Sequence, residues 1–113
     1  MDCIFCKIVN DEIPGQLLLR DEYVCAFRDI NPVAPSHVLI VPNKHVDSID
    51  SLSTEDAGLA GKLLLAVKEI ARMENIASSG YRVIVNNGVD GHQEVQHLHI
   101  HVIGGAPMQH QLG

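Results

Sequence analysis

Three histidines at every second position constrain the fold of this chain more than any other feature. The run alternates imidazole and aliphatic side chains in the order His97, Leu98, His99, Ile100, His101 and Val102. Aliphatic residues in such an alternation favour a strand. Successive side chains of a strand point to opposite faces, so three imidazoles share one face and an apolar stripe faces a core. The pattern predicts a strand at 98–103 with a functional site on its polar face.

The remaining patterns predict an α+β domain. We expect a short helix at 3–10, a hairpin from 17–19 and 23–27, strands at 38–41 and 81–85, and a long helix from Ser53 to about Met73. Ser53 can cap the long helix. Its apolar face is expected to hold Ala60, Leu63, Leu64, Val67, Ile70 and Ala71. Short connections favour antiparallel pairing. The prediction is one domain, 1–113, with about five antiparallel strands and the helices on one face.

Charge and hydropathy exclude several classes of partner. The net charge is −6, with no basic stripe, so a nucleic-acid polymer is not expected as a partner, whereas a small phosphorylated ligand is compatible with the chain. No apolar run reaches the roughly 18–20 residues that span a bilayer. The first residues lack the basic and apolar regions of a signal peptide. We therefore expect a cytoplasmic protein that does not bind membranes.

The cysteines do not suggest a disulfide framework, because the chain has three of them and no export signal. Cys3 and Cys6 form a C-x-x-C pair, which indicates metal or redox chemistry in a cytosolic chain. Cys25 lies among apolar residues and is expected to be a small buried side chain.

Three interpretations of the histidine strand are compatible with its pattern. The imidazoles could be surface residues, although their neighbours are typical of a core. They could bind one metal ion together, but one strand spaces alternate side chains by roughly 6.5–7 Å, which makes convergence on one ion difficult. One imidazole could instead act as a nucleophile while its neighbours orient it.

The run His97-Leu98-His99-Ile100-His101-Val102-Ile103 resembles the histidine triad (HIT) signature, His-φ-His-φ-His-φ-φ with φ apolar. Further stretches resemble the Hint branch of that family: Ile4-Phe5-Cys6-Lys7-Ile8, Ala26-Phe27-Arg28-Asp29-Ile30-Asn31-Pro32, Ala34-Pro35-Ser36-His37, Pro42-Asn43-Lys44-His45, Gly80-Tyr81-Arg82, Asn86 and the Gly104-Gly105 pair. The resemblance covers residues 3 to 105. It implies a HIT-like fold with a five-stranded antiparallel sheet, one long and one short helix, and a homodimer whose sheets join into ten strands.

The same resemblance implies a nucleotide hydrolase or transferase that acts at the α-phosphorus, with purine nucleoside phosphoramidates as the typical Hint substrates. His99 would be the nucleophile that forms a nucleotidyl-histidine intermediate, His101 would bind phosphate or support the leaving group, and Asp29 would hold the ribose. The base would be enclosed by Phe5, Ile8, Phe27 and Ile30, and the phosphate side would be faced by Asn86 and Gln93. The alternatives are a dinucleoside polyphosphate hydrolase and a nucleotide-binding module without turnover.

Two positions depart from the family pattern. Glu94 stands where the best-studied Hint proteins carry a serine that can pass a proton to a departing amine. A carboxyl group could do the same only if burial or phosphate kept it protonated, so Glu94 is a candidate general acid or a sign of another leaving group. His92 replaces the usual glycine before Gln93 and is expected to be an exposed loop residue. The tail from Ala106 to Gly113 is expected to influence the choice of leaving group.

Several relatives in the HIT superfamily bind structural zinc through an N-terminal cysteine pair. The resemblance places the other two ligands at His45 and His97, which gives a candidate site of Cys3, Cys6, His45 and His97. Two thiolates and two imidazoles are a proper ligand set for closed tetrahedral zinc. An empty, reduced cysteine pair is the alternative. The zinc prediction would give His97 a role separate from catalysis.

Overall fold

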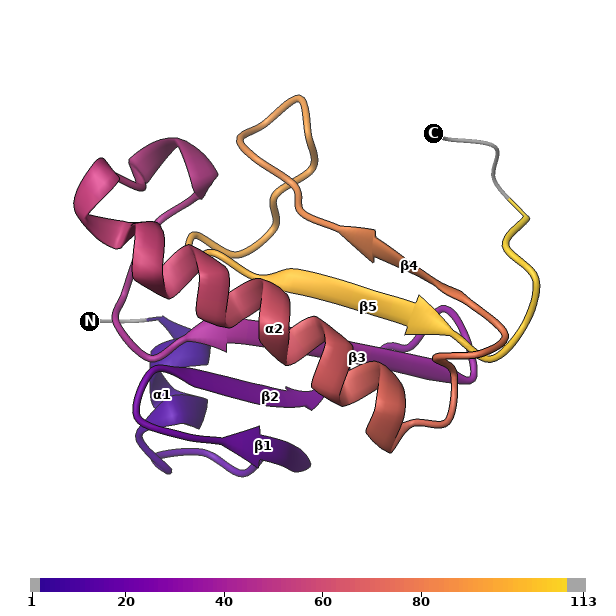
Figure 1. The fold of residues 1–113 in the computed structure, drawn as a ribbon. Coiled ribbons are helices and arrows are strands. Elements are labelled where there is room, and N and C mark those ends of the chain that lie inside the picture. The colour runs from indigo at the N-terminus through magenta and orange to yellow at the C-terminus, as the bar shows by residue number, and fades with distance from the viewer. Residues whose placement is uncertain (1–2, 110–113) are drawn as a thin grey trace.

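The computed structural model describes residues 3–109, and its five strands form one antiparallel sheet (Figure 1). The elements are α1 (Ile4–Val9), β1 (Leu17–Arg20), β2 (Val24–Arg28), β3 (Ser36–Pro42), the 3-10 turns η1 (Ile49–Ser51) and η2 (Thr54–Asp56), α2 (Ala57–Met73), β4 (Tyr81–Ile84) and β5 (Ile100–Gly104). The strand order is β1-β2-β3-β5-β4, and every pairing is antiparallel. The predicted α+β class and five-stranded sheet are confirmed. The ends of the predicted domain, 1–2 and 110–113, lie outside the described residues.

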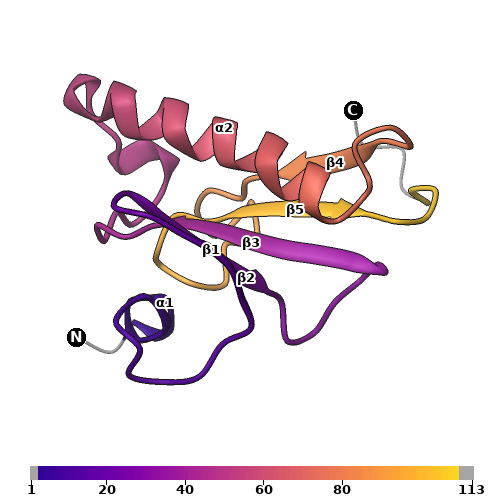
Figure 2. The ribbon, with the colours of Figure 1, turned by 60° about the horizontal axis from the view of Figure 1, so that its bottom comes forward.

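The two helices cover opposite faces of the sheet, so the prediction that they share one face is wrong (Figure 2). The core under α2 contains Val24, Ala26, Val38, Ile40, Ile100 and Val102 from the strands. The core on the α1 side contains Cys3, Phe5, Cys25, Phe27, Leu39 and Val41. The physical reason lies in β3, which is buried along its whole length. A continuous apolar run of this kind is typical of a strand covered on both faces.

Helix α2 begins as predicted from the Ser53 signal, but through one 3-10 turn. The Ser53 hydroxyl accepts a hydrogen bond from the Glu55 N–H, and the Asp56 carboxylate accepts one from the Ser53 N–H. This reciprocal pair satisfies N–H groups that the first turn leaves without partners. The helix buries Leu63, Ala66, Val67, Ile70 and Ala71.

Leu64 was expected on the buried face of α2, yet its side chain is 65 % exposed in the single chain. Its neighbour Leu65 is 67 % exposed. Successive helix residues are rotated by about 100°, which turns Leu64 and Leu65 past the edge of the face that Leu63 and Val67 bury. Two adjacent exposed leucines form an apolar spot on the outer surface of the helix.

No helix within residues 3–109 has the length and apolar character needed to cross a bilayer.

The alternation at 97–102 holds, although the paired part of β5 begins only at Ile100, two residues later than predicted. Leu98, Ile100 and Val102 all join the core under α2, so the intervening imidazoles face the α1 side. Ladder pairing between β3 and β5 ends at Ile40 and Ile100. Before Ile100 the backbone hydrogen-bonds to the segment after β3 instead, where the Leu98 N–H donates to the Val46 carbonyl at 2.6 Å.

Candidate active site

A cleft of about 850 Å³ opens on the α1 face of the sheet. Its walls come from α1, the turn at 13–16, the end of β2 with the following loop, and the histidine strand. The lining residues are Ile4, Phe5, Ile8, Ile13, Pro14, Gly15, Gln16, Phe27, Arg28, Asp29, Ile30, Asn31, Leu39, Glu94, Val95, His99 and His101. His99, His101 and Asp29 lie near one another and form what we call the polar end of the cleft, and Phe5 and Phe27, with Ile8 and Ile30, form the apolar end.

His99 is held in one tautomer by its own neighbourhood. Its Nδ1 lies 2.7 Å from the carbonyl oxygen of His97, and a carbonyl can only accept, so Nδ1 carries the proton. The neutral ring then keeps a lone pair on Nε2. The imidazole is buried, with its centroid 5.1 Å from that of Phe5 in an edge-on arrangement. A buried, oriented imidazole with an available Nε2 has the properties of a nucleophile.

His101 receives its orientation from His37, a residue of β3. The Val33 N–H donates to His37 Nδ1 at 3.2 Å, so the proton of the neutral His37 ring is on Nε2. This Nε2 lies 2.9 Å from His101 Nδ1, which leaves His101 with its own proton on Nε2. Burial, followed by the neighbouring His99 and His37, lowers the pKa of His101 to about 4. Burial also lowers the pKa of His37. Both rings are therefore neutral near pH 7.

Asp29 closes the polar end of the cleft beside these histidines. One carboxylate oxygen, Oδ1, accepts a hydrogen bond from the Asn31 N–H at 2.8 Å. The other, Oδ2, lies 3.4 Å from His37 Nε2. A carboxylate held in this way has acceptor capacity left for two hydroxyl groups. It can bind a diol without moving.

The apolar end of the cleft brings together the four residues expected to enclose a base. Phe5 and Phe27 meet edge to face, with centroids 5.4 Å apart. Ile8 lines the same space, and Ile30 lies at its mouth with 87 % of its surface exposed. Flat apolar walls of this kind suit an aromatic ring system.

The structure does not bring Asn86 and Gln93 to the cleft, because neither is among its lining residues. The Gln93 amide donates to the carbonyls of Asp47 and Val95 and accepts from the Gly88 N–H. All of its hydrogen-bonding groups are thus used to hold the loop together. In the described residues the Gln93 side chain therefore stabilises the loop. Its expected role at the phosphate stays a prediction.

Glu94 lines the cleft, as the general-acid hypothesis requires, but its side chain is exposed. The hypothesis that Glu94 acts as a general acid stays a prediction. His92 is exposed, as expected, with a left-handed φ of 62°. A left-handed backbone explains why glycine suits this position. At Gly91 a side chain would lie 2.7 Å from the Asn87 carbonyl, so this neighbour must be glycine.

The four expected zinc ligands form one cluster whose ligand atoms all lie within 4.8 Å of one another. Cys3 Sγ and His97 Nδ1 are 3.3 Å apart, Cys6 Sγ and His45 Nδ1 are 3.3 Å apart, and Cys6 Sγ and His97 Nδ1 are 3.5 Å apart. Ligands of one tetrahedral zinc ion should be separated by about 3.5–3.8 Å, given its bond lengths. The residues therefore fit zinc in both kind and spacing.

Partners outside the cluster orient both imidazoles for a metal. His97 Nε2 donates to the Pro42 carbonyl at 2.9 Å, and His45 Nε2 donates to the Asp47 carboxylate at 2.8 Å. Each ring thus presents the lone pair of Nδ1 to the thiols, as metal-bound histidines do. Burial, followed by the neighbouring Cys3, raises the pKa of Cys6 to about 11, so the metal-free pair retains a proton that metal binding would release.

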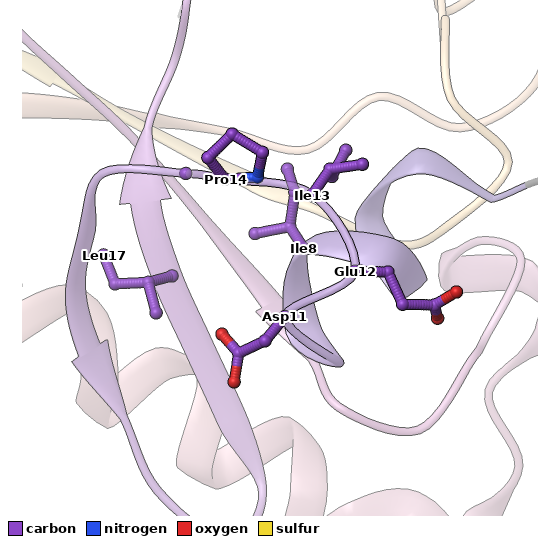
Figure 3. Close-up of a pocket in the computed structure, with 7 residues that line it drawn as sticks. Ile8, Asp11, Glu12, Ile13, Pro14 and Leu17 are labelled. Atoms are coloured by element: carbon purple, nitrogen blue, oxygen red, sulfur yellow. The ribbon is translucent and has the colours of Figure 1, made fainter.

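Sequence reasoning missed the turn at 13–16, which forms one wall of the cleft. Pro14 and Gly15 are residue types that favour a turn, but they give no sign of where the turn packs. Ile8 points from α1 toward this turn (Figure 3). A side chain at Gly15 would lie 3.1 Å from Ile8. A smaller cavity of about 360 Å³ on this wall is lined by the carboxyl groups of Asp11 and Glu12 and by apolar residues.

Comparison with known proteins agrees with this geometry. The HIT domain family model matches residues 10–108. The purine nucleoside phosphoramidase of Escherichia coli (strain K12) is 42% identical over 107 residues, which cover 95% of this chain and 90% of that protein. Protein HitA of Neisseria gonorrhoeae is 45% identical over 103 residues, covering 91% and 95%.

Solved structures of HIT proteins have the same fold as this chain. A HIT family hydrolase from Legionella pneumophila Philadelphia 1 has a TM-score of 0.95 at 40% identity, with 99% of this chain and 100% of that chain covered. A histidine triad protein from Clostridium difficile has a TM-score of 0.94 at 44% identity, covering 97% and 96%. These matches show that the chain belongs to the HIT family, and within it the chain is a hydrolase.

Proposed function

We propose that the protein hydrolyses purine nucleoside phosphoramidates through a covalent nucleotidyl-His99 intermediate. The observation that carries the proposal is the Nε2 lone pair of His99, which the bond from Nδ1 to the His97 carbonyl fixes at the polar end of the cleft. The aromatic slot that continues from it is sized for a base, and a relative of similar length is named for this activity.

In the proposed reaction the purine lies between Phe5 and Ile30, and Asp29 accepts hydrogen bonds from the ribose. His99 Nε2 attacks the α-phosphorus, a nitrogen–phosphorus bond to the enzyme forms, and the bond to the leaving amine breaks. The amine departs with a proton, for which Glu94 is the candidate donor, while His101 Nε2–H donates to a phosphate oxygen. Water then attacks the phosphorus and gives one proton back to the Glu94 carboxylate, while the bond from phosphorus to His99 Nε2 breaks; this releases the nucleoside monophosphate and restores His99 and Glu94.

The test is a quenched reaction with adenosine 5′-phosphoramidate, followed by mass spectrometry of the peptides. We expect an AMP adduct on His99 and hydrolysis that His99→Ala abolishes. His92→Ala is the matched control, because His92 is an exposed histidine outside the cleft lining, and it should keep wild-type turnover. Faster turnover of a dinucleoside polyphosphate would favour the sister activity, and nucleotide binding without any turnover would contradict the proposal in favour of a binding module.

We further propose that Cys3, Cys6, His45 and His97 hold one structural zinc ion. Bound there, zinc would supply a closed tetrahedral cross-link and no open position for a substrate. The cluster ties together the start of α1, the segment three residues after β3 and the histidine strand, and Phe5 lies between the two cysteines in the sequence. We expect one zinc per chain by elemental analysis, lost in a Cys3→Ala and Cys6→Ala double variant. Cys25→Ala should keep the metal, because the buried Cys25 is not part of the cluster. Protein without stoichiometric zinc would refute the site.

A homodimer is proposed from the exposed apolar residues of α2 and the sheet edge. Leu64 and Leu65 are exposed on α2, and the edge strand β4 exposes Tyr81 and Val83. Pairing of two such faces would cover them and join two sheets into ten strands. Light scattering should give twice the mass of one chain, and Leu65→Lys should reduce it to one chain. Leu17→Lys, on the opposite edge strand, is the control and should leave the dimer intact. A wild-type mass of one chain would contradict the proposal.

A further inference from the structure

One proton on His37 has two acceptors. The Val33 N–H occupies His37 Nδ1 at 3.2 Å, so the single proton of the neutral ring is on Nε2. This Nε2 makes its hydrogen bond to His101 Nδ1 at 2.9 Å, and Asp29 Oδ2, at 3.4 Å, is near enough to become the alternative acceptor. The His37 side chain is only 4 % exposed, so solvent offers little alternative. The two acceptors therefore compete for one donor.

The outcome of this competition decides what His101 presents to a substrate. When His37 donates to His101 Nδ1, His101 must carry its own proton on Nε2 and can donate to a phosphate oxygen. When His37 donates to Asp29, His101 Nδ1 loses the partner that fixes its tautomer. A His101 ring protonated on Nδ1 would face the phosphate with a lone pair, which repels the phosphate oxygens.

Asp29 is also the residue that faces the sugar in the proposed function. Its Oδ1 accepts a hydrogen bond from the Asn31 N–H at 2.8 Å, which favours the orientation that keeps Oδ2 beside His37. Two ribose hydroxyl groups that donate to this carboxylate would satisfy its charge and weaken its attraction for the His37 N–H. The hydrogen bond from His37 would then go to His101 alone.

We propose that binding of the ribose hydroxyls at Asp29 fixes the tautomer of His101 through His37, so that sugar recognition sets up catalysis. This inference rests on the proposed function and deepens it. His37 is a positioning residue, since it touches neither the base nor the phosphate in this scheme. Sugar discrimination should accordingly appear in kcat, in addition to any effect of the lost hydrogen bonds on KM.

The first experiment observes the tautomer directly, by ¹⁵N NMR of the histidine rings in wild-type protein. With AMP bound, we expect His101 to show a protonated Nε2 and an unprotonated Nδ1. With 2′,3′-dideoxy-AMP at saturation, the two ring nitrogens should show averaged shifts typical of mixed tautomers. Identical His101 shifts in the two complexes would overturn the inference without touching the proposed hydrolysis.

The second experiment compares kcat for ribose and 2′,3′-dideoxyribose phosphoramidates. In wild type the dideoxy substrate should lose at least about tenfold in kcat, because correct placement of a proton donor is typically worth about 10²–10⁴ in rate. In His37→Leu, kcat should fall for both substrates and become independent of the sugar. His37→Gln has two amide N–H donors that can serve both acceptors, so it should restore turnover and reduce the discrimination.

The results separate the two hypotheses. An enzyme that forms the adduct on His99 but shows the same kcat for both sugars, or keeps wild-type kcat in His37→Leu, would overturn the relay while the hydrolase function stands. The absence of any adduct or turnover would instead refute the proposed function. If His37→Leu does not fold, the NMR comparison in wild-type protein still decides the question.

Discussion

Replacing Glu74 with Gln removes a carboxylate that joins the end of α2 to the two strands beside the active site. Glu74 accepts two hydrogen bonds from Arg28, at 2.6 and 2.8 Å, and one from the Ser36 hydroxyl at 2.8 Å. Arg28 precedes Asp29, and Ser36 precedes His37. The carboxylate therefore holds together the two backbone segments that place this acid and this histidine in contact.

The structure sets the size of the effect. Breaking a fully buried ion pair costs about 3–5 kcal/mol. The Glu74 side chain is 10 % exposed but that of Arg28 is 40 % exposed, so solvent compensates part of the loss. Gln keeps one oxygen that can still accept from Arg28 or Ser36. We expect a loss of about 2 kcal/mol in the free energy of unfolding at pH 7, or about 6–12 °C in Tm for a domain of this size.

The pH dependence gives a stricter test. The hydrogen bonds from Arg28 lower the pKa of Glu74 below its ordinary value. A carboxyl group with a lowered pKa stabilises the fold above its unfolded pKa of about 4.3, and this contribution is lost as the pH falls through the folded pKa. Urea unfolding at a series of pH values should therefore show the difference between wild type and Glu74→Gln shrinking from about 2 kcal/mol toward zero.

The matched control is Glu69→Gln, which breaks the exposed pair between Glu69 and Arg72 on the same helix. This variant should unfold with the wild type at pH 7, because exposed ion pairs are screened by solvent. A Glu74→Gln variant as stable as Glu69→Gln would refute the reasoning. So would a difference from wild type that stays constant across the acid range.

Four further substitutions have directions fixed by backbone geometry or burial. His92→Gly should raise the free energy of unfolding by about 0.5–1 kcal/mol in urea titrations, because φ at this position is 62°; a loss would contradict the strain. Gly104→Ala should lower the free energy of unfolding by about 1–3 kcal/mol in thermal melts, because the added Cβ would lie 2.8 Å from Ile76. Gly58→Ala should instead raise it by about 0.5–1 kcal/mol, because Gly58 lies in α2 with open space around it. The pKa of His101 is lowered to about 4, so the stability that it contributes is complete above about pH 6.5 and is lost as the pH falls toward 4. In His101→Gln the free energy of unfolding should therefore fall less between pH 6.5 and 4 than in wild type. An unchanged dependence of stability on pH would contradict this prediction.

Local patterns in the sequence predicted most of the fold. Alternation at 97–102 placed Leu98, Ile100 and Val102 in one core, and the Ser53 signal marked the start of the long helix. The arrangement of the helices was missed, because the apolar run of β3 indicates burial but does not say which element covers each face. Leu64 was assigned to the buried face because sequence periodicity does not define where that face ends.

The candidate site, like the fold, could be predicted from the sequence only where a local motif carries the residues. The residues on the histidine strand and in the cysteine pair follow motifs, and the structure gathers them as the motifs imply. The contact between His37 and Asp29 joins residues eight positions apart through a proline-containing loop, and no local pattern fixes that distance. For Gln93, the role implied by the family resemblance stays a prediction, and that resemblance gave no information on the three backbone groups that its amide binds.

Helix α1 has only six residues, too few to be stable alone in water. Arg20 donates to the carbonyls of Ile8 and Val9 at its C-terminal end, and the cluster of Cys3, Cys6, His45 and His97 holds its N-terminal end. One wall of the cleft thus belongs to a short segment, which we expect to unfold locally while the sheet and α2 stay intact. Its amide hydrogens should exchange before those of β3, and a bound nucleotide should protect them first. We expect this wall to assemble late in folding, because it needs partners more than 90 residues apart in the chain, as Cys3 and His97 are.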